Sequence, residues 1–141
     1  MNGVKTPLDG YRKWFWAATV YNALWGTFTS LFPNAFFQWI GMPPPNYPWM
    51  FQCIGMVVGV YALGYALVAL DPVRYGAFAW VGIAGKVLGP LGFLVSASMG
   101  IIPWRFGWLN VFNDLIWLPA FLSFGYRHWK DGYLLSKKDA K

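Results

Sequence analysis

The chain has 141 residues, of which 57% are apolar and only 11% are charged, with no glutamate. Soluble domains carry roughly 25% charged residues, so this chain lacks the charge needed to cover a water-facing surface. Its net charge of +6 lies in short basic clusters beside apolar stretches, which excludes nucleic acid as the partner. The composition, with ten tryptophans, predicts a single all-α domain over residues 1–141 that is integral to a lipid bilayer.

The first apolar stretch predicts a membrane-spanning helix over residues 14–32. It is longer than the core of a signal peptide, and no small-residue cleavage site follows it, so we expect it to be retained. Residues 33–49 carry no charge and are rich in proline and aromatic residues. We expect this segment to lie in the outer interface, with one short turn of helix over 36–40, because consecutive prolines stop a helix.

The second span, residues 50–70, contains no charged residue. A polar turn at 71–74 separates it from the third span, residues 75–99, and a second turn at 100–105 leads to the fourth span, residues 106–125. A cytoplasmic tail is expected over 126–141. Four spans of about 20 residues each occupy most of the chain, so the sequence predicts one bundle of four transmembrane helices.

The basic residues outside these spans set the orientation. Nine of them lie on one side of the membrane under the four-span plan, and only Arg105 lies on the other. The nine are Lys5, Arg12, Lys13, Arg74, Arg127, Lys130, Lys137, Lys138 and Lys141. Because basic residues favour the cytoplasmic side, both termini are predicted to be cytoplasmic, in a multi-pass protein of the cell membrane, here a bacterial inner membrane.

Cysteine and histidine each occur once, as Cys53 and His128. One cysteine excludes an intrachain disulfide, and we expect Cys53 to be a small buried residue near the outer end of a helix, with an intermolecular disulfide as the alternative. One histidine excludes bis-histidine haem ligation, and no cluster of metal-ligating residues is present. We therefore predict no metal and no cofactor, and an interfacial position for His128.

Small residues follow helical spacing in the predicted spans. Gly82, Gly85, Lys86 and Gly89 share one face of the third span, because positions i, i+3, i+4 and i+7 lie on one stripe. The second span contains further glycines, and the first contains Gly26. Helices in a bilayer approach each other closely through small residues, so these glycines are predicted to be packing seams.

The fourth span has a polar face. Asn110, Asn113, Asp114 and Trp117 follow the same i, i+3, i+4, i+7 spacing. Unsatisfied polar groups in hydrocarbon cost several kcal/mol, so this face is predicted to point into the bundle, towards polar partners.

Depth along the helices suggests which partners these are. Lys86, Asp114 and Asn22 each fall near the middle of their spans, in agreement to about one helical turn at 1.5 Å per residue. A Lys86–Asp114 ion pair is therefore predicted, with the asparagines completing the hydrogen bonds. Pro90 has no N–H to donate to the carbonyl of Lys86, so the third helix is expected to kink there.

Three segments resemble the small DoxX-like membrane proteins. They are Gly64-Tyr65-Ala66 ahead of Asp71-Pro72, the run Gly82-x-x-Gly85-Lys86, and Asn113-Asp114-Leu115-Ile116-Trp117. The resemblance covers residues 50–120 and includes the four-span plan. It implies a four-helix membrane fold, in a group of which some members are associated with quinone-linked oxidation. This chain has no additional soluble domain or cofactor motif that would make such an activity self-contained.

Two functions remain open at this point. One is a non-catalytic polytopic membrane protein, an accessory subunit of a larger membrane complex or a homo-oligomer. It rests on the absence of redox cysteines, nucleotide motifs and metal clusters. The other is a membrane-embedded enzyme or carrier that binds a quinone or lipid-like small molecule at Lys86–Asp114, because ionisable residues inside a membrane mark functional sites by default. A buried pair can equally fix the register of two helices.

Overall fold

The computed structural model describes residues 6–134, and all regular secondary structure within this range is helical. The prediction of an all-α chain is therefore confirmed. The three longest helices are α1 (Arg12–Leu31), α3 (Pro48–Leu70) and α4 (Ala77–Ser98). Short helices precede or follow them along the chain: η1 (Asp9–Tyr11), α2 (Ala35–Trp39) and η2 (Trp104–Phe106). The last part of the chain forms α5 (Gly107–Asn110), the π-helix η3 (Val111–Leu115) and α6 (Leu118–Lys130).

Two of these helices, α3 and α4, are long and apolar enough to cross a membrane, with mean hydropathies of 2.2 and 1.6. The helix α1 has 20 residues but a more polar composition. The prediction of one continuous helix over 106–125 is wrong, because η3 and two turn residues interrupt the helix. Residues 126–130, expected in the tail, belong to α6.

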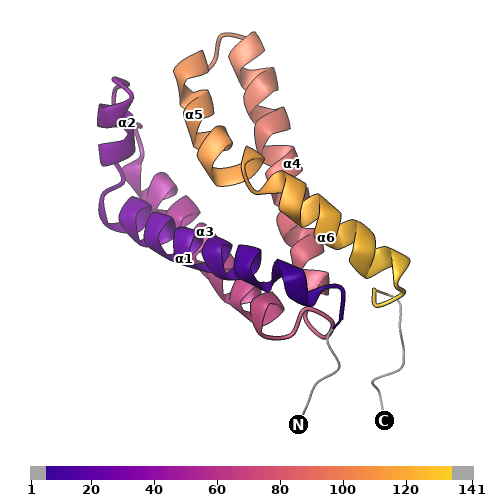
Figure 1. Cartoon of the computed structure of the whole chain (residues 1–141). Helices are drawn as coiled ribbons and strands as arrows, with labels where there is room; N and C mark the ends of the chain where they lie inside the picture. Colours follow the sequence, from indigo (N-terminus) through magenta and orange to yellow (C-terminus); the bar gives the residue numbers. More distant parts are fainter. Residues whose placement is uncertain (1–5, 135–141) are drawn as a thin grey trace.

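The first hairpin of the fold consists of α1 and α3, which run side by side (Figure 1). Gly26 makes this contact close: a methyl group added to it would lie 2.6 Å from the carbonyl oxygen of Gly55 and 2.6 Å from the amide nitrogen of Gly59. At the other end of the pair, Arg12 donates hydrogen bonds to the carbonyls of Ala69 (2.7 Å) and Leu70 (2.8 Å). These are carbonyls that the end of α3 leaves without helical partners.

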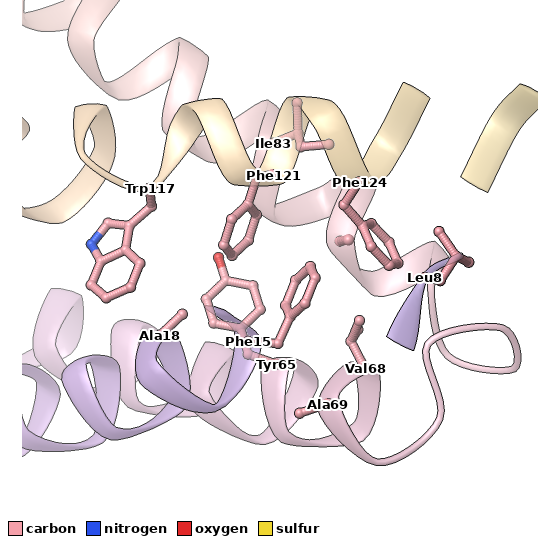
Figure 2. Close-up of a cluster of buried hydrophobic side chains, with 11 residues drawn as sticks. Leu8, Phe15, Ala18, Tyr65, Val68, Ala69, Ile83, Trp117, Phe121 and Phe124 are labelled. Atoms are coloured by element: carbon pink, nitrogen blue, oxygen red, sulfur yellow. The ribbon is translucent and has the colours of Figure 1, made fainter. Parts of the chain in front are cut away.

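The second half of the fold is α4 packed against η3 and α6. A core of buried side chains joins it to the first hairpin near the start of α1 and the end of α6 (Figures 1 and 2). Every long helix contributes to this core, which includes Phe15 of α1, Tyr65 of α3, Ile83 of α4, and Phe121 and Phe124 of α6. At the opposite end, a smaller cluster of Phe36, Phe37 and Phe51 packs against Phe106 and Leu109.

One expectation about a single residue was wrong: Cys53 is exposed on α3 rather than buried. His128 is 1% exposed, because its ring packs against Phe124 (5.6 Å between ring centroids), Tyr133 (6.0 Å) and the backbone at Gly76. A methyl group on Gly76 would overlap the imidazole ring, so the absence of a side chain there makes room for the histidine.

Candidate functional site

The interruption between α5 and α6 changes which backbone carbonyls are available. In an α-helix, the N–H groups of residues 116 and 117 would donate to the carbonyls of Phe112 and Asn113. Here Ile116 N–H donates to Val111 (3.2 Å), a π-type bond, and Trp117 N–H donates to Asp114 (3.2 Å). The carbonyls of Phe112 and Asn113 are therefore released from those partners.

Two side chains donate hydrogen bonds to these released carbonyls. The indole Nε1 of Trp117 donates to the carbonyl of Phe112 at 2.9 Å, and the Nζ of Lys86 donates to the carbonyl of Asn113 at 2.7 Å. The lysine thus fastens the irregular turn of one helix to the middle of α4. Proline at position 119 favours the interruption, since it has no N–H to donate to the carbonyl of Leu115. Single π turns of this kind recur at functional sites.

Lys86 and Asp114 form the predicted ion pair at this turn, and the pair is a long one. The distance from Lys86 Nζ to Asp114 Oδ1 is 4.0 Å, and the two residues are only 4% and 7% exposed. The ammonium group also lies over the rings of Phe121 (5.3 Å) and Tyr65 (5.8 Å), an arrangement that favours a cation. Asn113 donates to Asp114 Oδ1 at 3.1 Å, so the second carboxylate oxygen, Oδ2, is the one left for another partner.

A cavity of about 200 Å³ lies directly beside this pair. Four elements contribute polar side chains to its wall: α1, α3, α4 and η3. These side chains are Asn22, Tyr61, Tyr65, Lys86, Asn113 and Asp114. The structure therefore brings together four of the five residues that the sequence singled out. The fifth, Asn110, is buried one turn before Asp114 and lines a different groove, between α4 and α5.

The glycines of α4 make room for the polar side chains of the cavity. A methyl group on Gly82 would lie 2.6 Å from the hydroxyl of Tyr65, and one on Gly89 would lie 3.1 Å from Asp114 Oδ2. Gly85 is more open, since its added methyl group would lie 3.9 Å from the hydroxyl of Tyr61. The glycines of α4, which were predicted to be a packing seam, thus face side chains of the neighbouring helices. Gly26 on α1 instead faces the backbone of α3.

Sequence reasoning missed Tyr61 and Tyr65 as members of the site. Their spacing of four residues places both on one face of α3, and this was the available signal. The helix α4 continues from Ala77 to Ser98 through Pro90 (Figure 1), so the proline does not end it. The interruption lies opposite, in η3.

No group of three histidine, cysteine or acidic residues within residues 6–134 is placed to hold a metal ion. The side chains that line the cavity supply hydrogen-bonding groups and charge. No family model, curated protein or solved structure matches this chain.

Proposed function

We propose that the chain crosses the bilayer four times, with both termini in the cytoplasm of a bacterial cell. The helices α3 and α4 supply two spans, α1 supplies the first, and the interrupted stretch over residues 107–125 supplies the last. At 1.5 Å per residue, the 20 residues of α1 extend about 30 Å, which equals the thickness of the hydrocarbon core. The nine basic residues on one side and Arg105 on the other support the orientation.

Epitope tags on the two termini test this topology. In intact cells, neither tag is accessible to an antibody added outside, and both become accessible once the inner membrane is permeabilised. An externally accessible tag at either end contradicts the four-span arrangement.

We further propose that the cavity beside Lys86 and Asp114 binds a small neutral molecule, quinone-like or lipid-like in class. The observation that carries this proposal is that the two buried charges lie 4.0 Å apart and line a cavity instead of closing onto each other. Buried polar groups are normally satisfied by hydrogen bonds, and a pair that exists only to fix helix register has no need of a cavity. The resemblance to DoxX-like proteins agrees with this class of ligand.

The charges and size of the cavity restrict the ligand. Lys86 and Asp114 balance each other, so a neutral ligand leaves the site neutral, whereas an ion adds a buried charge. The lysine ammonium and the Asn22 amide are donors, Asp114 Oδ2 is an acceptor, and the tyrosine hydroxyls serve as either. The volume of about 200 Å³ is below the roughly 300–1,000 Å³ of sites for drug-sized ligands, and it suits a single ring.

Thermal unfolding of the purified protein in detergent, with and without tetramethyl-1,4-benzoquinone, tests this function. This quinone has no free ring position for cysteine addition, and its two carbonyls accept hydrogen bonds from the donors of the cavity. A ligand that binds the folded state raises the midpoint of unfolding. We expect a rise that is lost in Asp114→Asn and Lys86→Met and is kept in Leu88→Ala, a change on the exposed face of α4. A rise of equal size in all four proteins contradicts binding at this cavity.

The second candidate function is a non-catalytic accessory subunit of a membrane complex. A groove of about 540 Å³ between α4 and α5 favours it, because its walls are apolar and aromatic and it contains Arg105, the one basic residue of the outer side. Filling this groove with Leu94→Trp should release a partner that co-purifies in mild detergent, while Leu88→Trp outside the groove should retain it. If both variants retain the partner, the groove is not its binding site.

A further inference from the structure

A second cavity adjoins the polar one. It has a volume of about 340 Å³, lies between α3 and α4, and shares Tyr61 and Tyr65 with the polar cavity. Its remaining walls are apolar: Val60, Leu63, Gly64, Leu67, Phe78 and Val81. The two tyrosines therefore separate a polar compartment from an apolar one.

The tyrosines are suited to this boundary. Tyrosine has an apolar ring and a polar tip, and the two hydroxyls lie beside Gly82 and Gly85 of α4, which also line the polar cavity. Their rings are left to line the apolar compartment. A molecule that extends across this boundary thus meets hydrogen-bonding groups at one end and hydrocarbon at the other.

The apolar compartment opens away from the protein. Leu63 is 69% exposed and Val81 is 55% exposed, so the walls of the compartment continue onto the outer faces of α3 and α4. Gly64 and Phe78 lie within about two helical turns of the linker that joins Leu70 to Ala77. Under the four-span topology, this linker is cytoplasmic, and the compartment therefore opens towards the inner leaflet of the bilayer.

We infer that the ligand is an amphiphile with one apolar tail, whose ring-sized head occupies the polar cavity and whose tail lies in the groove between α3 and α4. The groove is also its access route, laterally from the inner leaflet. This inference rests on the proposed binding function and adds the shape of the ligand and the path by which it arrives. The wall of Tyr61 and Tyr65 that the groove shares with the polar cavity distinguishes it from an ordinary surface for bilayer lipid.

Gly64 offers a way to fill the groove without touching the polar cavity. A methyl group at this position would lie 3.5 Å from the ring of Phe78, an ordinary contact, so Gly64→Ala is a matched control. The larger side chain of Gly64→Leu extends into the groove. Val81→Phe fills the same groove from α4 and serves as a second variant if Gly64→Leu fails to fold.

The experiment compares two probes that differ only in the tail: tetramethyl-1,4-benzoquinone and 2-decyl-3,5,6-trimethyl-1,4-benzoquinone. Binding to the full chain in lipid nanodiscs is measured against empty nanodiscs, which corrects for partition of the tail into lipid. We expect Gly64→Leu to weaken the tailed probe about tenfold and to leave the tail-less probe unchanged. Gly64→Ala should bind both probes as the wild type does.

The outcomes separate this inference from the function on which it rests. If the tail-less probe binds the wild type and the tailed probe binds Gly64→Leu and Val81→Phe without loss, the groove is not the tail site and the inference is overturned, while the binding function stands. If neither probe binds the wild type above empty nanodiscs, both are overturned. Selective loss of the tailed probe in the groove variants supports both.

Discussion

Two glycine-lined contacts of this molecule have different neighbours in space. On α1, Gly26 lies against the backbone of Gly55 and Gly59 of α3. On α4, Gly82 and Gly89 lie against a tyrosine hydroxyl and a carboxylate. The first contact holds two helices together, and the second keeps them apart by the width of a side chain.

The comparison shows that a glycine stripe indicates close approach without saying what approaches. A close contact between backbones forms where both helices present glycines, as Gly26 of α1 and Gly55 and Gly59 of α3 do. A cavity forms where the facing helices present polar side chains, as α3 and η3 present Tyr65 and Asp114 to α4. Substitutions should therefore have different consequences at the two contacts.

The largest effect is expected from Gly26→Ala. The added methyl group would lie 2.6 Å from backbone atoms of α3, which cannot rotate away, so the two helices must separate. Overpacking costs about 1–3 kcal/mol and occasionally more, and we expect a loss at the upper end, measured as thermal unfolding in detergent. The control is Gly59→Ala, whose methyl group meets nothing within 4 Å; equal losses in both variants contradict a backbone contact at Gly26.

The next effect concerns the charges of the cavity. Lys86→Met removes the hydrogen bond to Asn113 and leaves Asp114 without its cation, and Asp114→Asn leaves the buried lysine without its anion. Breaking a buried pair costs about 3–5 kcal/mol, and the 4.0 Å separation and adjoining cavity reduce our expectation to about 2 kcal/mol for each variant. The double variant should recover part of this loss. Strictly additive losses mean that the two charges do not interact.

A smaller effect is expected from Gly82→Ala, the counterpart of Gly26→Ala in the second contact. Its methyl group would lie 2.6 Å from the Tyr65 hydroxyl, but this is the end of a side chain that can move into the adjoining cavity. We expect a loss of about 1 kcal/mol in thermal unfolding, partly relieved in Gly82→Ala/Tyr65→Phe. A loss as large as that of Gly26→Ala would show that the two contacts are equally rigid.

The smallest effect is expected at a third glycine contact. Gly76 makes room for His128, which lies beyond the residues proposed to span the bilayer. Burial lowers the pKa of the His128 imidazole below its usual value of 6.5, and the backbone of Val73 opposes the shift. The unfolded chain then binds more protons than the folded one as pH falls below about 6.5, so stability is full above this pH and declines below it. We expect a loss of at most about 1 kcal/mol between pH 7.5 and 5.5.

The control for this pH dependence is His128→Phe, which keeps an aromatic ring between Phe124 and Tyr133 and removes the titrating group. Thermal unfolding of this variant should depend less on pH over the same range. An unchanged dependence assigns the effect to another group.

The sequence predicted much of the helical framework, because composition and proline positions act locally. The predicted span 50–70 agrees with α3 to within two residues, and the turn at 36–40 lies within one residue of α2. It did not predict the interruption between α5 and α6. A π turn depends on which carbonyls find side-chain partners, and Lys86, which takes one of them, comes from a different helix.

The sequence by itself determined that the chain is helical and rich in apolar residues, and that Lys86, Asp114 and the asparagines must find polar surroundings, because unpaired polar groups in an apolar environment are costly. Only the tertiary structure decided how they do so. The lysine bonds a carbonyl released by η3, the carboxylate remains 4.0 Å from it, and Tyr61 and Tyr65 of α3 close the cavity between them. Such an arrangement depends on distances between four separate elements, and spacing within any one of them carries no information about those distances.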